Sequence, residues 1–452
     1  MIKDLYKNPL MFTDCYNLSH QNFKINTDWE VSYLYNRSAP MVLYGFAENV
    51  SNIFNTPITY NDIEEAAHYA KQAGLWFPED LFIPICDIYH GYFPLKIRSI
   101  PDGTWVPQGT PFAEVSNTVE GFGELVTWWE GRLLKSWFPS ACATRAFHMR
   151  NYCSQNNYNL SKFHSFGFRS HRSEEDAYWC GRAWNLMMQG SDDFHTLRHI
   201  PRRLINHIPA LAHKVVQQFD SELESYFRAI WSTKRHGGKI VALVIDTFDP
   251  WYFIENLSEG VVEYGKAMDI HIVFRPDSGN VFDQAETLLR MYDKQDVSVI
   301  IGEGMTFEKA KIYDQQLKLD GIDPNRISYG IGGGFHIDLT RDTLGWAMKT
   351  AYSNGKDRMK FSMDRGKMSL PGYLDVVKDN GKIKVIPTEP DFYNNHSLYR
   401  VIYRDGSIRN VNNDILSNID NINRNDLQSF IIVSDELQSK INTFKEKYVR
   451  RI

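Results

Sequence analysis

The chain has 452 residues, which exceeds the usual size of one domain, so we expect two domains with sizeable hydrophobic cores. Hydrophobic residues make up 43% of the chain and charged residues 23%, which is typical of a soluble globular protein. The formal net charge is −5, whereas a nucleic-acid-binding protein would normally be basic, so we expect no nucleic-acid partner.

The cysteines and the lack of long apolar segments indicate the compartment. No pair of cysteines has the spacing of a CxxC motif or a zinc site, and the odd number predicts reduced thiols, as in a cytoplasm. The N-terminus has no apolar run like that of a signal peptide, and no segment is long enough to cross a bilayer. We therefore expect a cytoplasmic protein without a membrane partner. The cysteines are Cys15, Cys86, Cys142, Cys153 and Cys180.

The first 145 residues or so mix short predicted strands and helices. VSYLYNR (31–37) and PLKIRSI (94–100) are predicted strands, and EGFGELVTWWEGRLLKSWF (120–138) is predicted to form one amphipathic or buried helix.

A regular alternation of strands and helices follows, from about residue 160 to residue 352. The predicted strands are nearly continuous apolar runs, which is expected when both faces of a sheet are covered. Strands that alternate with helices in this way indicate a parallel sheet with crossover helices. The predicted strands are FHSFGF, KIVALVI, DIHIVF, VSVII, RISYGI and WAMKTAY.

Polar residues end several of these strands: Asp246, Asp277, Glu303 and Gly334. The carboxyl ends of the strands form the active site of an α/β barrel, and an open doubly wound sheet follows a similar rule. The number of polar strand ends favours the barrel, which we place at residues 151–370. The flanking segments are residues 1–150 and the hairpin-like tail 371–452, which ends in a predicted helix (434–447). The tail either docks on the barrel or returns to the N-terminal domain.

A glycine-rich segment, RISYGIGGGFHIDLTRD (326–342), contains Gly330, Gly332, Gly333 and Gly334. Exposed backbone N–H groups and a following helix N-terminus can form a phosphate site. The spacing is not GxGxxG, so a dinucleotide site is poorly supported. The alternative is a tight turn that needs glycine for its geometry. We favour phosphate binding because a barrel places such loops late in the chain.

Carboxylates and an arginine lie at neighbouring strand ends. In FRPDSGN, Arg275 can pair with a phosphate, and Asp277 can bind ribose hydroxyls or a hydrated Mg²⁺. The alternative is a structural Arg–Asp pair that closes a loop. Asp246 shares the predicted rim with Asp277 and Glu303, which favours a functional role, whereas Asp249 is interpreted as a turn or cap residue.

Three further segments have a structural interpretation, and two of them also have a functional one. In FHSFGFRS, Phe166 can stack on a flat ligand or lie in the core, and Arg169 can bind an anion. In GSDD, Asp192 is read from its surroundings as a turn or cap residue. His213 lies at a predicted helix start, where a phosphate on its ring would be stabilised, although a lone histidine is more often structural.

Taken in order, these motifs resemble the nicotinamide phosphoribosyltransferase family over nearly the whole chain. The matching segments are TDCYNLSH, FGFR, GSD, IPALAH, VIDTFD, FRPDSGN, IIGEG, YGIGGG and LTRD. Each motif is short, but FRPDSGN followed by GxGGG and LTRD is highly specific.

The resemblance implies a fold, a reaction and a partner. The fold would combine an irregular parallel α/β barrel with a β-rich α+β domain formed by both chain ends. The reaction would join nicotinamide to the phosphoribosyl group of phosphoribosyl pyrophosphate, giving nicotinamide mononucleotide and pyrophosphate in NAD salvage, with Mg²⁺. The protein would be a homodimer with shared active sites.

Residue roles follow by the same resemblance. Phe166 and the partner's Tyr16 would sandwich the pyridine ring, and Asp192 would accept a hydrogen bond from the amide. Asp246 and Asp277 would be catalytic and would hold Mg²⁺, and His213 would be phosphorylated by ATP. The phosphoribosyl and phosphate groups would contact Arg169, Arg275, Gly302, Glu303, Gly333, Gly334, Arg37, Arg341, Lys349 and Lys360.

Two departures from the family pattern affect these expectations. The family has an acidic residue before the histidine and a serine after it, whereas this chain has Ala212 and Lys214. ATP coupling is therefore less well supported than the transfer itself. Glu303 stands where the family has aspartate, so the carboxylate is one methylene longer.

Three alternatives remain on sequence grounds. A nicotinate phosphoribosyltransferase would share the barrel and Mg²⁺, but the Asp192 carboxylate would repel nicotinate. A non-catalytic nicotinamide or nucleotide sensor would not need Arg275, Asp277 and the glycine-rich segment together. A sugar-phosphate isomerase would need a paired acid and base on facing strands, which the sequence does not single out.

Overall fold

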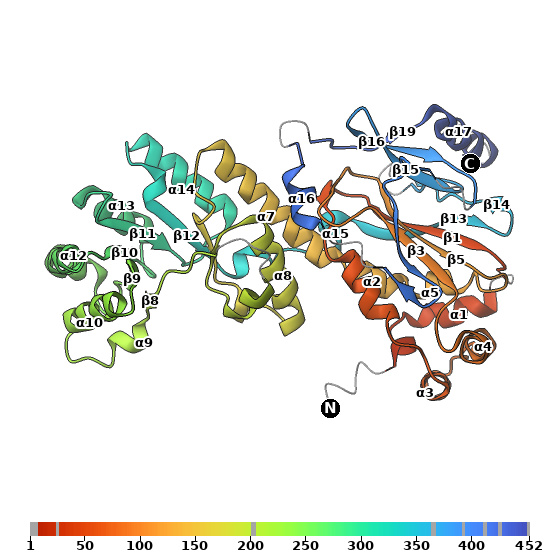
Figure 1. Ribbon diagram of the computed structural model, residues 1–452, viewed down its shortest axis with the longest axis horizontal. Coiled ribbons are helices and arrows are strands. Elements are labelled where there is room, and N and C mark those ends of the chain that lie inside the picture. Colours follow the sequence, from red (N-terminus) through yellow and green to blue (C-terminus); the bar gives the residue numbers. More distant parts are fainter. Residues whose placement is uncertain are drawn as a thin grey trace. The chain divides into compact units, whose positions relative to one another are not determined.

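The computed structural model describes residues 8–23, 27–199, 205–362, 368–390, 394–409, 414–423 and 427–449. The chain forms two compact units (Figure 1). Arg145–Leu339 make up one, which we call the barrel unit. Met1–Thr144 and Thr340–Ile452 make up the other, the terminal unit, so the C-terminal tail returns to the N-terminal part. The barrel was expected to extend to residue 370, whereas this unit ends at Leu339.

The barrel unit contains a seven-stranded sheet in which all neighbouring strands are parallel. Helices α10 (Glu222–Arg235), α12 (Ser258–Ala267), α13 (Val281–Met291) and α14 (Phe307–Leu319) alternate with its strands (Figure 1). The expected parallel α/β architecture is therefore confirmed. The strand order is β7 (Gly190–Ser191), β6 (Phe163–Ser165), β12 (Ile327–Ile331), β11 (Val297–Ile301), β10 (His271–Arg275), β9 (Ile240–Val244) and β8 (Ala210–Leu211).

One short segment links the two edges of this sheet. The N–H of Asn206 donates to the carbonyl of Gln189 at 2.7 Å, and the N–H of Ser191 donates to the Asn206 carbonyl at 3.2 Å. A few residues later, β8 pairs with β9, and the Ala242 N–H donates to the Pro209 carbonyl at 2.8 Å. Residues 206–211 therefore pair with the edge strand β7 at one end and form the other edge strand, β8, at the other end, and the sheet curls into an irregular barrel.

The terminal unit is built on a seven-stranded sheet whose strands pair antiparallel. Both chain ends contribute strands to it, as the resemblance implied: three strands from the N-terminal part lie between strands from the C-terminal part. Its order is β14 (Lys356–Asp357), β13 (Trp346–Ser353), β1 (Glu30–Asn36), β5 (Pro111–Asn117), β3 (Leu95–Ser99), β17 (Arg400–Arg404) and β18 (Ser407–Ile408). A three-stranded sheet consists of β15 (Leu374–Asp379), β16 (Lys382–Pro387) and β19 (Ile432–Val433). A two-stranded sheet consists of β2 (Met41–Val42) and β4 (Trp105–Val106).

Further helices of the terminal unit lie before β3, directly before β13 or in the C-terminal tail. They are α1 (Cys15–Phe23), α2 (Phe46–Phe54), α3 (Tyr60–Gln72), α4 (Glu79–Tyr89), α15 (Arg341–Leu344), α16 (Ile415–Asp420) and α17 (Asp435–Val449). Within the described ranges, no helix combines the length and apolar character that a membrane span requires.

The single helix expected at residues 120–138 is instead broken into α5 (Leu125–Trp128), α6 (Glu130–Leu134) and the start of α7 (Trp137–Gln155). Trp128 packs against Phe77 and Phe82, whereas Trp129 packs against Phe54 and Phe93. Adjacent residues of a regular helix point in different directions. The break between α5 and α6 lets both adjacent indoles be fully buried.

WAMKTAY does not lie in the parallel sheet where we expected it. It forms β13, which pairs antiparallel with β1 in the terminal unit, with Lys349 opposite Tyr33. An apolar strand pattern indicates burial but does not identify the neighbouring strand, because pairing is decided by contacts distant in sequence.

Candidate active site

The ring of Phe166 lies at the carboxyl end of β6, over the backbone of neighbouring strands. The Phe166 N–H donates to the Ile331 carbonyl at 2.9 Å. A Cβ on Gly330 would come within 2.0 Å of the Phe166 ring, and one on Gly302 within 3.3 Å. Glycine at these positions therefore leaves room for the ring. The side chain is half-buried and also packs against the core residues of β9, β10 and β11. Both sequence interpretations of Phe166 thus have a basis in its packing.

The two adjacent aspartates after β7 have different surroundings. Asp193 is 4% exposed; its side chain accepts hydrogen bonds from the Ser165 hydroxyl and, at 3.0 Å, from the Phe168 N–H. It therefore holds the turn that follows Phe166. The Asp192 side chain is 21% exposed, and its main-chain N–H donates to the Ser165 carbonyl at 3.0 Å. Asp192 is the carboxylate that remains accessible beside Phe166.

Two histidines contact the Asp192 carboxylate. His164, buried on β6, places Nδ1 3.3 Å from one carboxylate oxygen. His207, which is half exposed, contacts the other oxygen through its Nδ1. Two imidazole contacts limit rotation of the carboxylate, so it is oriented before any ligand arrives. Neither histidine was expected from the sequence to take part in the site. The signal was a histidine two positions before Phe166, on the same side of a strand.

A second group of polar side chains lies at the ends of β9 and β10. His213 Nε2 lies 3.5 Å from an oxygen of Asp277 and 3.8 Å from Asp246 Oδ1, and His213 Nδ1 is 3.0 Å from the Thr247 hydroxyl. Arg275 Nη2 lies 3.9 Å from Asp277. Asp246 is nearly buried; it accepts a hydrogen bond from Ser278, while its Oδ1 has no hydrogen-bond partner.

His213 begins α9 (His213–Val216), as expected, although this helix has only four residues. Asp249 lies outside the group and caps α11 (Pro250–Tyr252). Its side chain accepts from the N–H groups of Trp251 and Tyr252, so its interpretation as a cap residue is confirmed.

The glycine-rich turn (residues 330–334) packs closely against two loops. A Cβ on Gly334 would lie 2.3 Å from the Met305 carbonyl oxygen, so only glycine fits there without movement. A Cβ on Gly333 would be in ordinary contact with Ser170. The turn therefore lies between the loop that carries Glu303 and the loop that carries Arg169. The side chains of Glu303 and Arg169 are both exposed.

The other predicted phosphate-binding residues lie in the terminal unit. Lys349 on β13 is half-buried, and burial lowers the pKa of its ammonium. The carboxylate of Glu130 opposes this shift in pKa, whereas the charges of Arg37, Lys360 and Arg341 add to it. All four predicted basic residues are thus close enough to interact, and together they form a cationic surface that suits a polyanion.

Tyr16 is also in the terminal unit, on α1, and its side chain is half exposed. Partial burial raises the pKa of its hydroxyl, and the nearby carboxylates of Glu130 and Asp14 raise it further. Tyr16 is therefore neutral at physiological pH, and its ring is available to a ligand or to another chain.

The predicted residues thus fall into two groups. The barrel unit holds those proposed for the ring, the ribose and Mg²⁺, namely Phe166, Arg169, Asp192, His213, Asp246, Arg275, Asp277, Gly302, Glu303, Gly333 and Gly334. The terminal unit holds Tyr16, Arg37, Arg341, Lys349 and Lys360. Sequence reasoning did not single out Asp193, Thr247 or Ser278, whose hydrogen bonds support the first group.

The chain is similar in sequence to a known family and to known proteins. Residues 161–360 match the nicotinate phosphoribosyltransferase (NAPRTase) family. The chain is 26% identical to a nicotinamide phosphoribosyltransferase of Xanthomonas campestris pv. campestris, over 82% of this chain and 88% of that protein. It is 25% identical to a nicotinamide phosphoribosyltransferase of Acinetobacter baylyi, over 70% of this chain and 74% of that protein. The resemblance inferred from the motifs is therefore confirmed.

A solved structure shows a similar fold. The crystal structure of human nicotinic acid phosphoribosyltransferase has a TM-score of 0.65 with this chain at 16% sequence identity. The similarity covers 96% of this chain and 99% of the human chain, so the fold is shared along essentially the whole length.

Proposed function

We propose that this phosphoribosyltransferase transfers the phosphoribosyl group of phosphoribosyl pyrophosphate to nicotinamide, releasing nicotinamide mononucleotide and pyrophosphate. The observation that carries the choice of base is the accessible carboxylate of Asp192, which two histidines orient beside Phe166. The similarity to nicotinamide phosphoribosyltransferases from two bacteria supports the same choice. The product would enter NAD salvage.

The proposed selectivity follows from charge. A carboxylate accepts a hydrogen bond from the amide NH₂ of nicotinamide but repels the carboxylate of nicotinate. In a poorly hydrated slot beside Phe166 this repulsion is worth several kcal/mol, on the order of a hundredfold in preference. Phe166 would supply one flat wall of the slot, and Tyr16 of a partner subunit the other.

The transfer itself requires orientation and charge stabilisation. The pyridine nitrogen already has a lone pair, so no general base is needed, and positive charge develops on the ribose as pyrophosphate leaves. Arg275, Arg169 and the backbone of Gly333 and Gly334 would hold the phosphoribosyl group. Arg37, Arg341, Lys349 and Lys360 would neutralise the leaving pyrophosphate, as the cationic surface of the terminal unit suits a polyanion.

Asp246 and Asp277 fit a magnesium ion by their chemistry. Mg²⁺ prefers carboxylate and water oxygens, and the buried Oδ1 of Asp246 has no hydrogen-bond partner. When bound, the ion would supply positive charge to the pyrophosphate. Arg275 and the two aspartates would orient the ribose.

We also propose a cytoplasmic homodimer with shared active sites. The exposed ring of Tyr16 supports a role at a partner's site, and the thiols, none of which is in a disulfide, suit a reducing compartment.

A product assay tests the proposed function directly. The protein is incubated with phosphoribosyl pyrophosphate, Mg²⁺ and either nicotinamide or nicotinate, each with and without ATP. We expect nicotinamide mononucleotide and pyrophosphate from the first base, with a much smaller rate on the second. Faster use of nicotinate would favour the nicotinate phosphoribosyltransferase alternative, and no pyrophosphate with either base would favour a non-catalytic sensor.

The role of ATP has its own test, because Ala212 and Lys214 depart from the family pattern around His213. His213 is 38% exposed; its Nδ1 contacts the Thr247 hydroxyl, which leaves Nε2 as the nitrogen that would accept the phosphoryl group. Incubation with γ-labelled ATP should leave acid-labile label on the wild type and none on His213→Ala. Equal labelling of both proteins would exclude His213 as the acceptor.

A further inference from the structure

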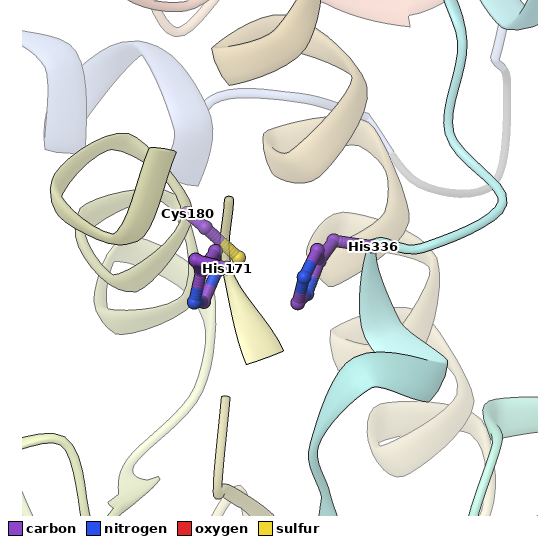
Figure 2. A group of neighbouring side chains, drawn as sticks. All are labelled: His171, Cys180 and His336. Atoms are coloured by element: carbon purple, nitrogen blue, oxygen red, sulfur yellow. The ribbon is translucent and has the colours of Figure 1, made fainter. Parts of the chain in front are cut away.

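Three side chains that can ligate a metal meet inside the barrel unit, and none of them belongs to the substrate site proposed above. His171 follows the 3-10 turn η3 (Phe168–Ser170), Cys180 lies in α8 (Glu174–Met187), and His336 follows the turn η7 (Gly333–Phe335). One nitrogen of each histidine and the Cys180 sulfur lie within 4.8 Å of one another. Figure 2 shows the two imidazole rings face to face, with the Cys180 sulfur beside them.

The hydrogen bonds of the two histidines leave one nitrogen of each ring available. His171 Nδ1 is 3.4 Å from the Phe168 carbonyl oxygen, and His336 Nε2 is 3.2 Å from that of Ser170. A carbonyl can only accept, so these nitrogens are assigned the N–H. The opposite nitrogens, His171 Nε2 and His336 Nδ1, are buried and have no hydrogen-bond partner. Histidine ligands of metals usually have this arrangement, with one nitrogen donating to a carbonyl and the other on the ion.

Burial also prepares these groups for a cation. His336 and Cys180 are only 7% and 3% exposed. Burial lowers the pKa of both histidines, and for His171 the charge of His336 lowers it further. Nearby charges have mixed effects. The carboxylate of Asp193 raises the pKa of His171. The carboxylate of Asp176 raises the pKa of His336, whereas Arg172 and Arg145 lower it. Burial thus favours the neutral imidazole, which is the form that binds a metal.

The present geometry needs a small adjustment to hold an ion. The rings are nearly parallel, with an interplanar angle of 6° and centroids 4.0 Å apart. A metal lies in the plane of each imidazole that binds it, so at least one ring must turn about its Cβ–Cγ bond. This torsion is broad, and the ligating nitrogens have no hydrogen bond to lose, whereas the bond from the opposite nitrogen to its backbone carbonyl must adjust as the ring turns. A tetrahedral zinc site would bring the ligand atoms to about 3.3–3.7 Å from each other, a closure of roughly 1 Å.

We propose that His171, Cys180 and His336 form a binding site for a divalent cation of borderline softness, and that Zn²⁺ fits it best. Two imidazoles and one thiolate are typical zinc ligands, with the fourth position left for water. The same donors suit Mg²⁺ poorly, because that ion prefers oxygen, so the site would not compete for the ion expected at Asp246 and Asp277.

The site would connect two segments of the proposed phosphoribosyl site. His171 lies two residues after Arg169, and His336 lies two residues after Gly334. An ion bound to both histidines and to α8 would tie the loop after β6 to the glycine-rich turn. The inference concerns the stability of these loops and does not depend on which base is the substrate.

Cobalt substitution tests the proposal on the untagged, metal-free full chain. Co²⁺ is added with Mg²⁺ present, and the thiolate-to-cobalt charge-transfer absorption is recorded. We expect this absorption to saturate at one ion per chain in the wild type and to be absent in Cys180→Ala. His171→Ala and His336→Ala should bind about tenfold more weakly or worse. A wild-type spectrum without a thiolate band, or a band that persists in Cys180→Ala, would overturn the proposal.

Thermal unfolding with Zn²⁺ gives a second readout and controls for folding. Cys153→Ala is the matched control, because it removes another fully buried thiol from the same unit. Zn²⁺ should raise the Tm of the wild type and of Cys153→Ala, but not that of Cys180→Ala or His336→Ala. If Cys180→Ala does not fold, the Tm of His171→Ala with and without Zn²⁺ tests the proposal instead, because His171 is only half-buried and its replacement disturbs the core less. An equal Tm increase in all variants would exclude this site.

Discussion

At the scale of single residues, Asp192 and Asp193 show how neighbouring identical side chains acquire different roles. The Asp193 carboxylate accepts hydrogen bonds from Ser165 and Phe168 and is almost fully buried. The Asp192 carboxylate is accessible and is oriented by His164 and His207. The sequence GSDD offers no means of separating them, because both aspartates suit the same turn.

Replacing Asp192 should change base selectivity. Asp192→Asn removes the charge that repels nicotinate while keeping an oxygen that accepts from the amide, so we expect the nicotinate-to-nicotinamide ratio of kcat/KM to rise. The full electrostatic effect is on the order of a hundredfold. Steady-state kinetics with both bases measures the ratio.

Asp193→Asn is the matched comparison for this experiment. It should lower the Tm, because it weakens the hydrogen bonds that hold the turn after Phe166, without favouring nicotinate. An unchanged base ratio in Asp192→Asn would show that another residue selects the base.

At the scale of secondary-structure elements, close contacts between strands explain residue choices that no motif explains. Gly330 on β12 lies against the ring of Phe166, the residue that follows the neighbouring strand β6, and any side chain at Gly330 would overlap this ring. The alternation of strands and helices was predictable from apolar periodicity, but this contact joins residues far apart in the chain. The broken helix at residues 120–138 has a similar origin, because two adjacent tryptophans have separate packing partners.

Gly330→Ala should therefore impair the site through Phe166. The added methyl carbon would lie 2.0 Å from the ring, so the ring must move out of its position. We expect the KM for nicotinamide to rise about tenfold or more, consistent with the cost of overpacking, about 1–3 kcal/mol. Gly260→Ala is the control, since its helix position is open and alanine favours helix. Equal KM values for the two variants would contradict the packing argument.

The buried carboxylate of Asp314 on α14 supports the strands of the barrel. Lys162 lies 2.9 Å from it, and the hydroxyls of Tyr152 and Tyr329 each donate to it at 2.8 Å. Asp314→Ala would leave the buried ammonium of Lys162 with carbonyl acceptors but no counter-ion, and we expect a loss of about 3–5 kcal/mol in the free energy of unfolding. Urea denaturation followed by circular dichroism measures this loss.

Glu308→Ala provides the control on the same helix. Glu308 pairs with Lys311 at the surface, where such pairs contribute about 0–1 kcal/mol. If the two variants were equally stable, the Lys162–Asp314 pair would not be a significant support of the barrel.

At the scale of the whole molecule, the proposed shared active sites predict complementation between inactive variants. Tyr16→Ala and Arg275→Ala remove residues that different subunits would contribute to one site. Co-expression should give mixed dimers in which one site carries both changes and the other carries neither. About a quarter of all sites would then be intact by random pairing.

The activity of the purified mixture tests whether two subunits share each active site. Recovery toward a quarter of wild-type activity is expected, whereas activity no higher than the average of the two variants would exclude sharing. Tyr16→Phe, which keeps the ring, should remain active alone and shows that the ring, not the hydroxyl, is needed.

The sequence by itself determined the order and type of most elements and, through its ordered motifs, the resemblance to phosphoribosyltransferases. These are local properties: apolar periodicity, glycine placement and short polar motifs are all read within a few residues. The tertiary structure alone decided that WAMKTAY pairs with β1 and that the helix expected at residues 120–138 is broken. It also brought His171, Cys180 and His336 together. These outcomes depend on contacts between residues far apart in the chain, and such contacts leave no local pattern in the sequence.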